Sequence, residues 1–127
     1  MKRWAVCRMV EIDGSREAAV NRYRCNTRVW SKPGFNWCVV HVAAPSLVEI
    51  QADPDIYMIP DGAMDNALST FPVATRNAMK TRLEAAGFEF ASVKTTWTVR
   101  KLLIHLAKQL EPGVTSVEDG DVVDIEQ

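Results

Sequence analysis

The segment WCVVHVA, residues 37–43, is apolar at every position except His41. An apolar run of this length that follows a turn signal, here SKPG at residues 31–34, is typical of a strand that is buried on both faces. Residues 3–12 also carry apolar side chains on both faces. We therefore expect a second strand there, in the centre of the same sheet.

NRYRCNTRVW, residues 21–30, alternates between two kinds of side chain. The even positions carry three cations, Arg22, Arg24 and Arg28. Strict alternation predicts a strand over residues 22–30 with the arginines on one exposed face. The preceding residues 13–20 begin with an Asp-Gly turn signal and continue either as one helical turn capped by Ser15 or as a loop.

Residues 45–60 predict a short helix followed by a strand. Residues 45–54 could be a helix or a strand. Ser46 followed three residues later by Glu49 matches a capping box, which favours a short helix, ended by Pro54, over a strand. The segment DIYMIP, residues 55–60, predicts a further strand. Together with the strand at 37–43, these elements form a compact βαβ-like unit.

The C-terminal half changes to a helical period. We expect one helix from about Pro72 to Ala86, stopped by Gly87, and a second from Trp97 to Leu110, capped by Thr95 or Thr96. The two helices are expected to pack as an antiparallel pair, with Met79 and Leu83 of the first facing Leu103 and Leu106 of the second. The buried stripe of the second helix comprises Val99, Leu102, Leu103, Leu106 and Leu110.

These elements predict an α+β fold with three regions. Residues 1–62 form a small N-terminal β-rich region, residues 63–113 form a C-terminal helical hairpin lobe, and residues 114–127 form an acidic tail.

Residues that usually carry chemistry are few and scattered. His41 lies in an apolar strand and is expected to be a hydrogen-bonded core residue, whereas His105 is expected to be a solvated surface residue. The acids between residues 53 and 65 stand beside Pro and Gly and predict turns. We expect no enzymatic activity, no catalytic or cofactor-binding residue and no metal site. The cysteines match no metal pattern and are expected to be buried, reduced thiols at Cys7, Cys25 and Cys38.

No apolar run reaches the roughly 18–20 residues that a membrane span needs. Arg8 and Glu11 interrupt the apolar start of the chain, so a secretion signal is not expected. The sequence therefore predicts synthesis and retention in a cytoplasm, without a membrane partner.

Charge is distributed in blocks of alternating sign, although the formal net charge is only -1. Residues 1–32 carry eight Lys or Arg against three acids, and residues 76–110 carry seven against two. Residues 33–75 carry five acids and residues 111–127 carry six, with no Lys or Arg in either block. Such blocks either pair with each other, pair with a neighbouring copy, or remain solvated faces.

Three interpretations of the arginine strand follow. The cations could lie along phosphates with Tyr23 or Trp30 for stacking, but the chain is not basic overall and its acidic tail would repel nucleic acid. They could guard an exposed sheet edge. We favour a third interpretation, in which they face the acidic tail of a neighbouring copy, with candidate partners Glu118, Asp119, Asp121, Asp124 and Glu126.

The order of short motifs carries a resemblance. DG…NRYR is followed by WCVVHVAAP…ADPDIYMIPD, then FPVATRNAMKTRLEAAGF, then TVRKLLIHLAKQLEP. Over residues 4–112 this order resembles a group of small tailed-bacteriophage proteins encoded among head and tail structural genes. Members often have a proline in the segment that matches residues 21–24, where this chain has Arg22.

The resemblance implies a virion component, such as a decoration, collar or head–tail joining protein, with no catalytic residue to carry over. We therefore expect a non-enzymatic structural protein that is made in the host cytoplasm and resides in the virion. Its expected partners are other copies of itself and phage head or tail proteins. The alternative is a small phage-encoded nucleic-acid-binding or host-modulating protein.

Overall fold

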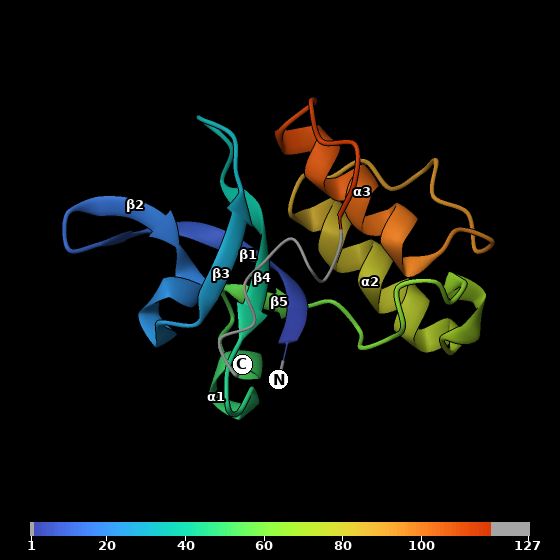
Figure 1. The fold of residues 1–127 in the computed structure, drawn as a ribbon, viewed down its shortest axis with the longest axis horizontal. Coiled ribbons are helices and arrows are strands. Elements are labelled where there is room, and N and C mark those ends of the chain that lie inside the picture. Colours follow the sequence, from blue (N-terminus) through green and yellow to red (C-terminus); the bar gives the residue numbers. More distant parts are fainter. Residues whose placement is uncertain (1, 118–127) are drawn as a thin grey trace.

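The structure, a computed structural model, describes residues 2–117 and has an α+β fold with an antiparallel sheet and helices on both of its faces (Figure 1). The strands are β1 (Lys2–Ile12), β2 (Ser15–Ala18), β3 (Asn26–Trp30), β4 (Trp37–Ala43) and β5 (Ile56–Met58). The α-helices are α1 (Val48–Gln51), α2 (Val73–Ala85) and α3 (Val99–Leu110), and the 3₁₀ helices are η1 (Ala19–Tyr23) and η2 (Leu68–Thr70).

Strand β1 is the centre of the sheet, as its two apolar faces predicted. It pairs with β4 along one edge, from Lys2 opposite Ala43 to Arg8 opposite Trp37. Its other edge pairs with β5 and, further along, with β2, and β3 continues the sheet beyond β4. The Asp13–Gly14 turn between β1 and β2 is confirmed, because both residues have the positive φ that a tight hairpin turn requires.

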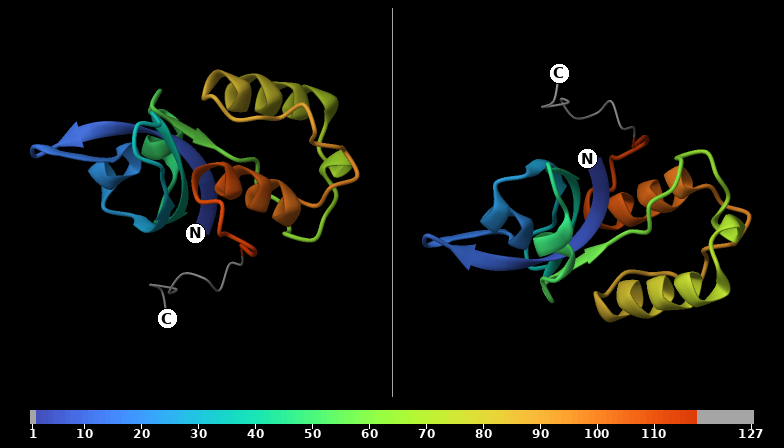
Figure 2. Two further views of the ribbon diagram at one scale, coloured as in Figure 1. Left: turned by 90° about the horizontal axis from the view of Figure 1, so that it is seen from above. Right: turned by 90° about the horizontal axis from the view of Figure 1, so that it is seen from below.

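The two faces of the sheet bury two separate cores. Successive residues of β1 point to opposite faces, so Trp4 and Val6 enter one core while Ala5 and Cys7 enter the other. Helices α2 and α3 cover the first face, which we call the large core, while η1 and α1 cover the second, the small core (Figure 2). Members of the large core include Trp30, Val39, Met79, Leu83, Leu102, Leu103, Leu106 and Val117.

Residues on both sides of position 62 therefore share the large core. Trp4 and Val39 from the β-rich region pack with Leu103 from the helical region. The first residues of the segment 114–127 also join it, because Val117 is fully buried there.

The strand–helix–strand unit is present, with an arrangement that the sequence did not reveal. Strands β4 and β5 run parallel to each other, but each pairs antiparallel with β1, which lies between them. Helix α1 therefore connects strands on opposite edges of β1. The capping box is not formed: the helix begins after Leu47, and the Ser46 hydroxyl accepts only a 3.4 Å bond from the Val48 amide.

The expected strand over residues 22–30 is wrong in its first half. Residues 15–18 form β2, residues 19–23 form η1, and Arg24 adopts a left-handed conformation with φ of 54°. The strand begins only at Asn26. Ala19 and Val20 are buried in the small core, and this burial favours the 3₁₀ turn over the alternating pattern.

The expected antiparallel pairing of the two long helices is also wrong. The start of α3 bonds to the segment before α2, through the Val99 amide and the Asn66 carbonyl. Glu89, just after the end of α2, bonds to Gln109 near the end of α3. The two helices therefore run in the same direction. Residues 87–98 allow this because they form a connection long enough to run back along the helices, whereas a tight hairpin of antiparallel helices needs only about 2–5 loop residues.

The end of α2 and the start of α3 are both stabilised by capping interactions. Gly87 stops α2 as predicted, with φ of 97°, and the Phe88 amide donates to the Leu83 carbonyl in a Schellman arrangement. At α3 the cap is Thr98, not Thr95 or Thr96, because the Thr98 hydroxyl accepts from the Lys101 amide at 3.1 Å. The buried stripe of α3 is confirmed at all five predicted positions.

Candidate interaction site

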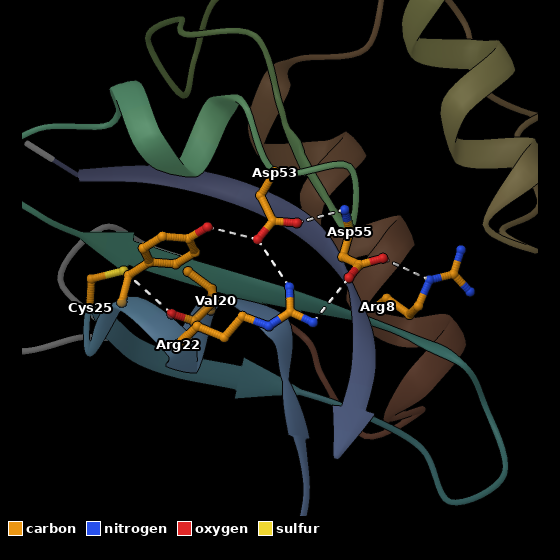
Figure 3. Close-up of polar contacts among 7 residues, drawn as sticks. Arg8, Val20, Arg22, Cys25, Asp53 and Asp55 are labelled. Carbon is orange, nitrogen blue, oxygen red and sulfur yellow. Dashed lines mark hydrogen bonds and ion pairs between the residues drawn. The ribbon is translucent and has the colours of Figure 1, made fainter. Parts of the chain in front are cut away.

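A network of ion pairs joins η1, β1 and the turn between α1 and β5 (Figure 3). Arg22 donates from Nη1 to Asp53 Oδ2 at 3.0 Å and from Nη2 to Asp55 Oδ2 at 3.1 Å. The Tyr23 hydroxyl donates to Asp53 Oδ2 at 2.7 Å, and Arg8 Nε donates to Asp55 Oδ1 at 3.2 Å. We call these five residues the Arg22 network.

Local backbone geometry presents the two carboxylates. Asp53 Oδ1 accepts from the Asp55 backbone N–H at 2.9 Å, a turn that aspartate forms two residues ahead of itself. Pro54, which lacks a backbone N–H, stands between them. The Arg8 amide donates to the Asp55 carbonyl at 2.8 Å, so β1 holds the second carboxylate against its own arginine.

Electrostatics show that Asp53 is the centre of the network. Its side chain is only 7% exposed, against 39% for Arg22. Burial disfavours the carboxylate, but the Asp55 amide, the Tyr23 hydroxyl and Arg22 outweigh it and hold the pKa of Asp53 below its ordinary value. The hydrogen bond to Asp53 raises the pKa of Tyr23, and the bond to Asp55 is the main reason why the pKa of Arg22 is raised.

A hollow of about 640 Å³ opens beside the network. It is lined by residues 22–25 and by residues between Ala43 and Ile50, so η1 and the α1 segment form its walls. Val48, on the wall from α1, is 73% exposed, the most exposed large apolar side chain of the described residues. Arg24 and Glu49 add one charge of each sign. We call this feature the η1–α1 hollow.

The structure separates the three arginines that the sequence grouped. Arg22 is paired within the chain, and Arg24 lies at the end of η1 on the η1–α1 hollow. Arg28 alone lies on β3, with its guanidinium 4.8 Å from the centre of the Trp30 ring. The three therefore do not form one exposed face. Their proposed acidic partners, Glu118, Asp119, Asp121, Asp124 and Glu126, lie outside the described residues.

The blocks of opposite charge pair with each other inside the chain. Two further ion pairs lie outside the Arg22 network. Arg3 Nε lies 3.9 Å from Asp61 Oδ1, and Arg100 Nε lies 3.3 Å from Asp65 Oδ1. Each pair joins a basic block to the acidic block 33–75. This pairing accounts for Arg22 without a neighbouring copy.

The Asp53–Pro54–Asp55 turn was correctly predicted, but the role of its acids was missed. Each aspartate binds a residue about thirty to fifty positions away, so no local spacing signalled the contact. The usable signal was the net charge of whole blocks: residues 33–75, with five acids and no Lys or Arg, offset the excess of five positive charges in residues 1–32, where eight Lys or Arg stand against three acids.

The prediction is confirmed for one histidine and wrong for the other. His41 is fully buried, with Nδ1 3.1 Å from the Thr27 hydroxyl and its ring against Trp4, so the core prediction is confirmed. His105 is not a solvated residue: its side chain is half-buried, packs edge-on to Trp97 and bonds to Glu89.

The prediction of buried, free thiols is confirmed for all three cysteines. Cys7 and Cys38 face each other across β1 and β4, with 3.4 Å between their sulfur atoms. Among residues 2–117, no group of three or more His, Cys, Asp or Glu side chains is arranged to hold a metal ion.

No helix in the described part of the chain combines the length and apolar character needed to cross a membrane.

A scan against protein-family models found no match, and neither curated proteins nor solved structures gave a significant match.

Proposed function

We propose that this chain is a non-enzymatic bacteriophage virion protein that works through protein–protein contacts in a multi-copy assembly. The observation that carries the contact role is the η1–α1 hollow with its exposed Val48. The bacteriophage context rests on the sequence resemblance over residues 4–112.

The hollow has the chemistry of a protein contact. Interfaces combine an apolar centre with a polar rim, and here the exposed Val48 shares the lining of the hollow with Arg24 and Glu49. The Arg22 network supports the η1 wall, because Arg22 and Tyr23 are both tied to Asp53. A wall held in this way presents a preorganised surface to a partner.

The first test is the presence of the protein in purified particles of the phage that encodes it. Mass spectrometry should detect it there at a constant ratio to the major head protein. Detection in infected-cell lysate but not in particles would contradict the proposal.

A substitution in the hollow tests the surface itself. Val48→Glu should lower incorporation into particles, because it replaces the exposed apolar side chain of the hollow with a charge that a partner would have to bury. Val73→Glu is the matched control, since Val73 is also exposed, at 61%, but lies on α2 away from the hollow. Equal incorporation of the two variants would exclude the hollow as the contact.

We expect weak binding to nucleic acid. Arg22 and Arg8 already face Asp53 and Asp55, so they are poorly placed to neutralise phosphates. Fluorescence anisotropy with labelled duplex and single-stranded DNA at physiological salt should show little binding and a shallow salt dependence. Tight binding that is lost in the Arg24→Ala/Arg28→Ala variant would instead favour the nucleic-acid-binding alternative.

A further inference from the structure

A second hollow lies between α2 and the segment that returns toward α3. Its volume is about 260 Å³, and its lining is predominantly apolar. The floor is formed by Leu68, Met79, Phe90 and Val93. We call it the α2 groove.

Cations border the α2 groove on both sides. Arg76 and Lys80 stand one helical turn apart on α2, and Lys94 stands on the opposite segment. The Arg76 guanidinium is bound to the carbonyls of Ser69 and Phe71, at 3.3 and 2.7 Å. Lys80 and Lys94 are exposed and form no ion pair with any of residues 2–117. The groove therefore offers an apolar floor and two available positive charges.

The complementary chemistry occurs in this chain, in EDGDVVDIEQ, residues 118–127. This segment carries five acids and three apolar side chains, with Val122 and Val123 directly between Asp121 and Asp124. Two adjacent valines flanked by acids match an apolar floor flanked by lysines. We propose that the α2 groove of one copy binds residues 118–127 of a second copy.

The place where the described chain ends favours a second copy over the same molecule. Val117 is buried in the large core, and its carbonyl accepts from Arg100 Nη1 at 3.1 Å near the start of α3. Both views in Figure 2 place α3 between this end and α2. Binding within one molecule would require residues 118–127 to pass around α3, whereas a neighbouring groove needs no such path.

This inference extends the self-association expected of a multi-copy assembly to a surface other than the η1–α1 hollow. It concerns purified protein in solution, so it does not depend on whether the chain is found in particles. A failure of one proposal leaves the other standing.

Charge reversal in full-length protein provides the test. The groove variant carries Lys80→Glu and Lys94→Glu, and the tail variant carries Asp121→Lys and Asp124→Lys. In sedimentation velocity over a concentration series, wild type should self-associate, and each variant alone should show a dissociation constant raised by about tenfold or more. An equimolar mixture of the two variants should regain association, because each reversed surface then meets an opposite charge.

Two controls complete the experiment. Lys32→Glu with Lys108→Glu makes the same change in net charge at exposed positions outside the groove and should associate as wild type does. Added salt should weaken wild-type association, since exposed charges are screened. A wild-type protein that stays monomeric, a groove variant that associates normally, or a mixture that does not regain association would each overturn the proposal.

Discussion

Replacing Leu106 with alanine should lower the free energy of unfolding by about 2–5 kcal/mol. Leu106 is fully buried in the large core, where α3 meets the face of the sheet that carries Trp4 and Trp30. Removing its side chain beyond Cβ deletes apolar contacts and leaves a cavity that a close-packed interior refills only in part. Urea unfolding followed by tryptophan fluorescence and by circular dichroism measures the loss.

Val73→Ala is the control for this substitution. Val73 is also apolar and helical, but it is 61% exposed, so the change should stay within about 0.5 kcal/mol. A loss below about 1 kcal/mol at Leu106 would contradict its place in the core. Both changes shorten an apolar helical side chain to alanine, by three carbon atoms at Leu106 and by two at Val73, so burial is the main difference between the two positions.

The sequence predicted those elements whose burial leaves a regular apolar pattern along the chain. Strand β4 is apolar at every position except His41 because both of its faces are buried, one in each core. The stripe of α3 follows the helical period because one side of this helix packs on the sheet. In both cases the apolar pattern shows which positions are buried. This is enough to predict the element without knowing which residues pack against it.

Residues 21–25 misled the prediction because their alternation has a different cause. Arg22 and Arg24 are exposed and Cys25 is buried, as a strand would have them. The backbone between them is nevertheless a 3₁₀ helix that ends in a left-handed residue. Burial of Ala19 and Val20 and the bond from Tyr23 to Asp53 stabilise this conformation, and both depend on residues distant in sequence.

The direction of α3 relative to α2 was likewise not a local property. Each helix was predicted within one to two residues of its observed bounds, except for the shifted cap at Thr98. Their relative orientation depends on the path of residues 87–98, which bond both to the segment before α2 and to α3. The amphipathic pattern identifies the buried face but not the direction of the neighbour.

Replacing Asp53 with asparagine should lower the free energy of unfolding by about 1–3 kcal/mol at neutral pH. Asparagine keeps the size of the side chain but removes the negative charge that Arg22 faces at 3.0 Å. The site is mostly buried on the aspartate side, so this pair should contribute more than an exposed one. A double-mutant cycle with Arg22→Ala measures the pairwise part of the loss.

Asp65→Asn is the matched control. Asp65 also pairs with an arginine, at 3.3 Å from Arg100, but its side chain is 85% exposed. Solvent screens such a pair, so its removal should change stability by about 0.5 kcal/mol or less. Equal losses at the two positions would show that the Arg22 network gains nothing from burial.

The pH dependence separates the charge of Asp53 from its packing. The network holds the pKa of Asp53 below its ordinary value, so the folded state keeps the carboxylate ionised at pH values where the unfolded chain binds a proton. Its contribution is therefore fully present above the unfolded pKa, at about pH 4, and is lost as the pH falls through the lower folded pKa. The difference in unfolding free energy between wild type and Asp53→Asn should be constant from about pH 5 to 7 and should shrink in more acidic solution. A difference that persists at its neutral value in strong acid would assign the loss to misfit of the amide, and the charge of Asp53 would then have no part in holding η1 against the turn before β5.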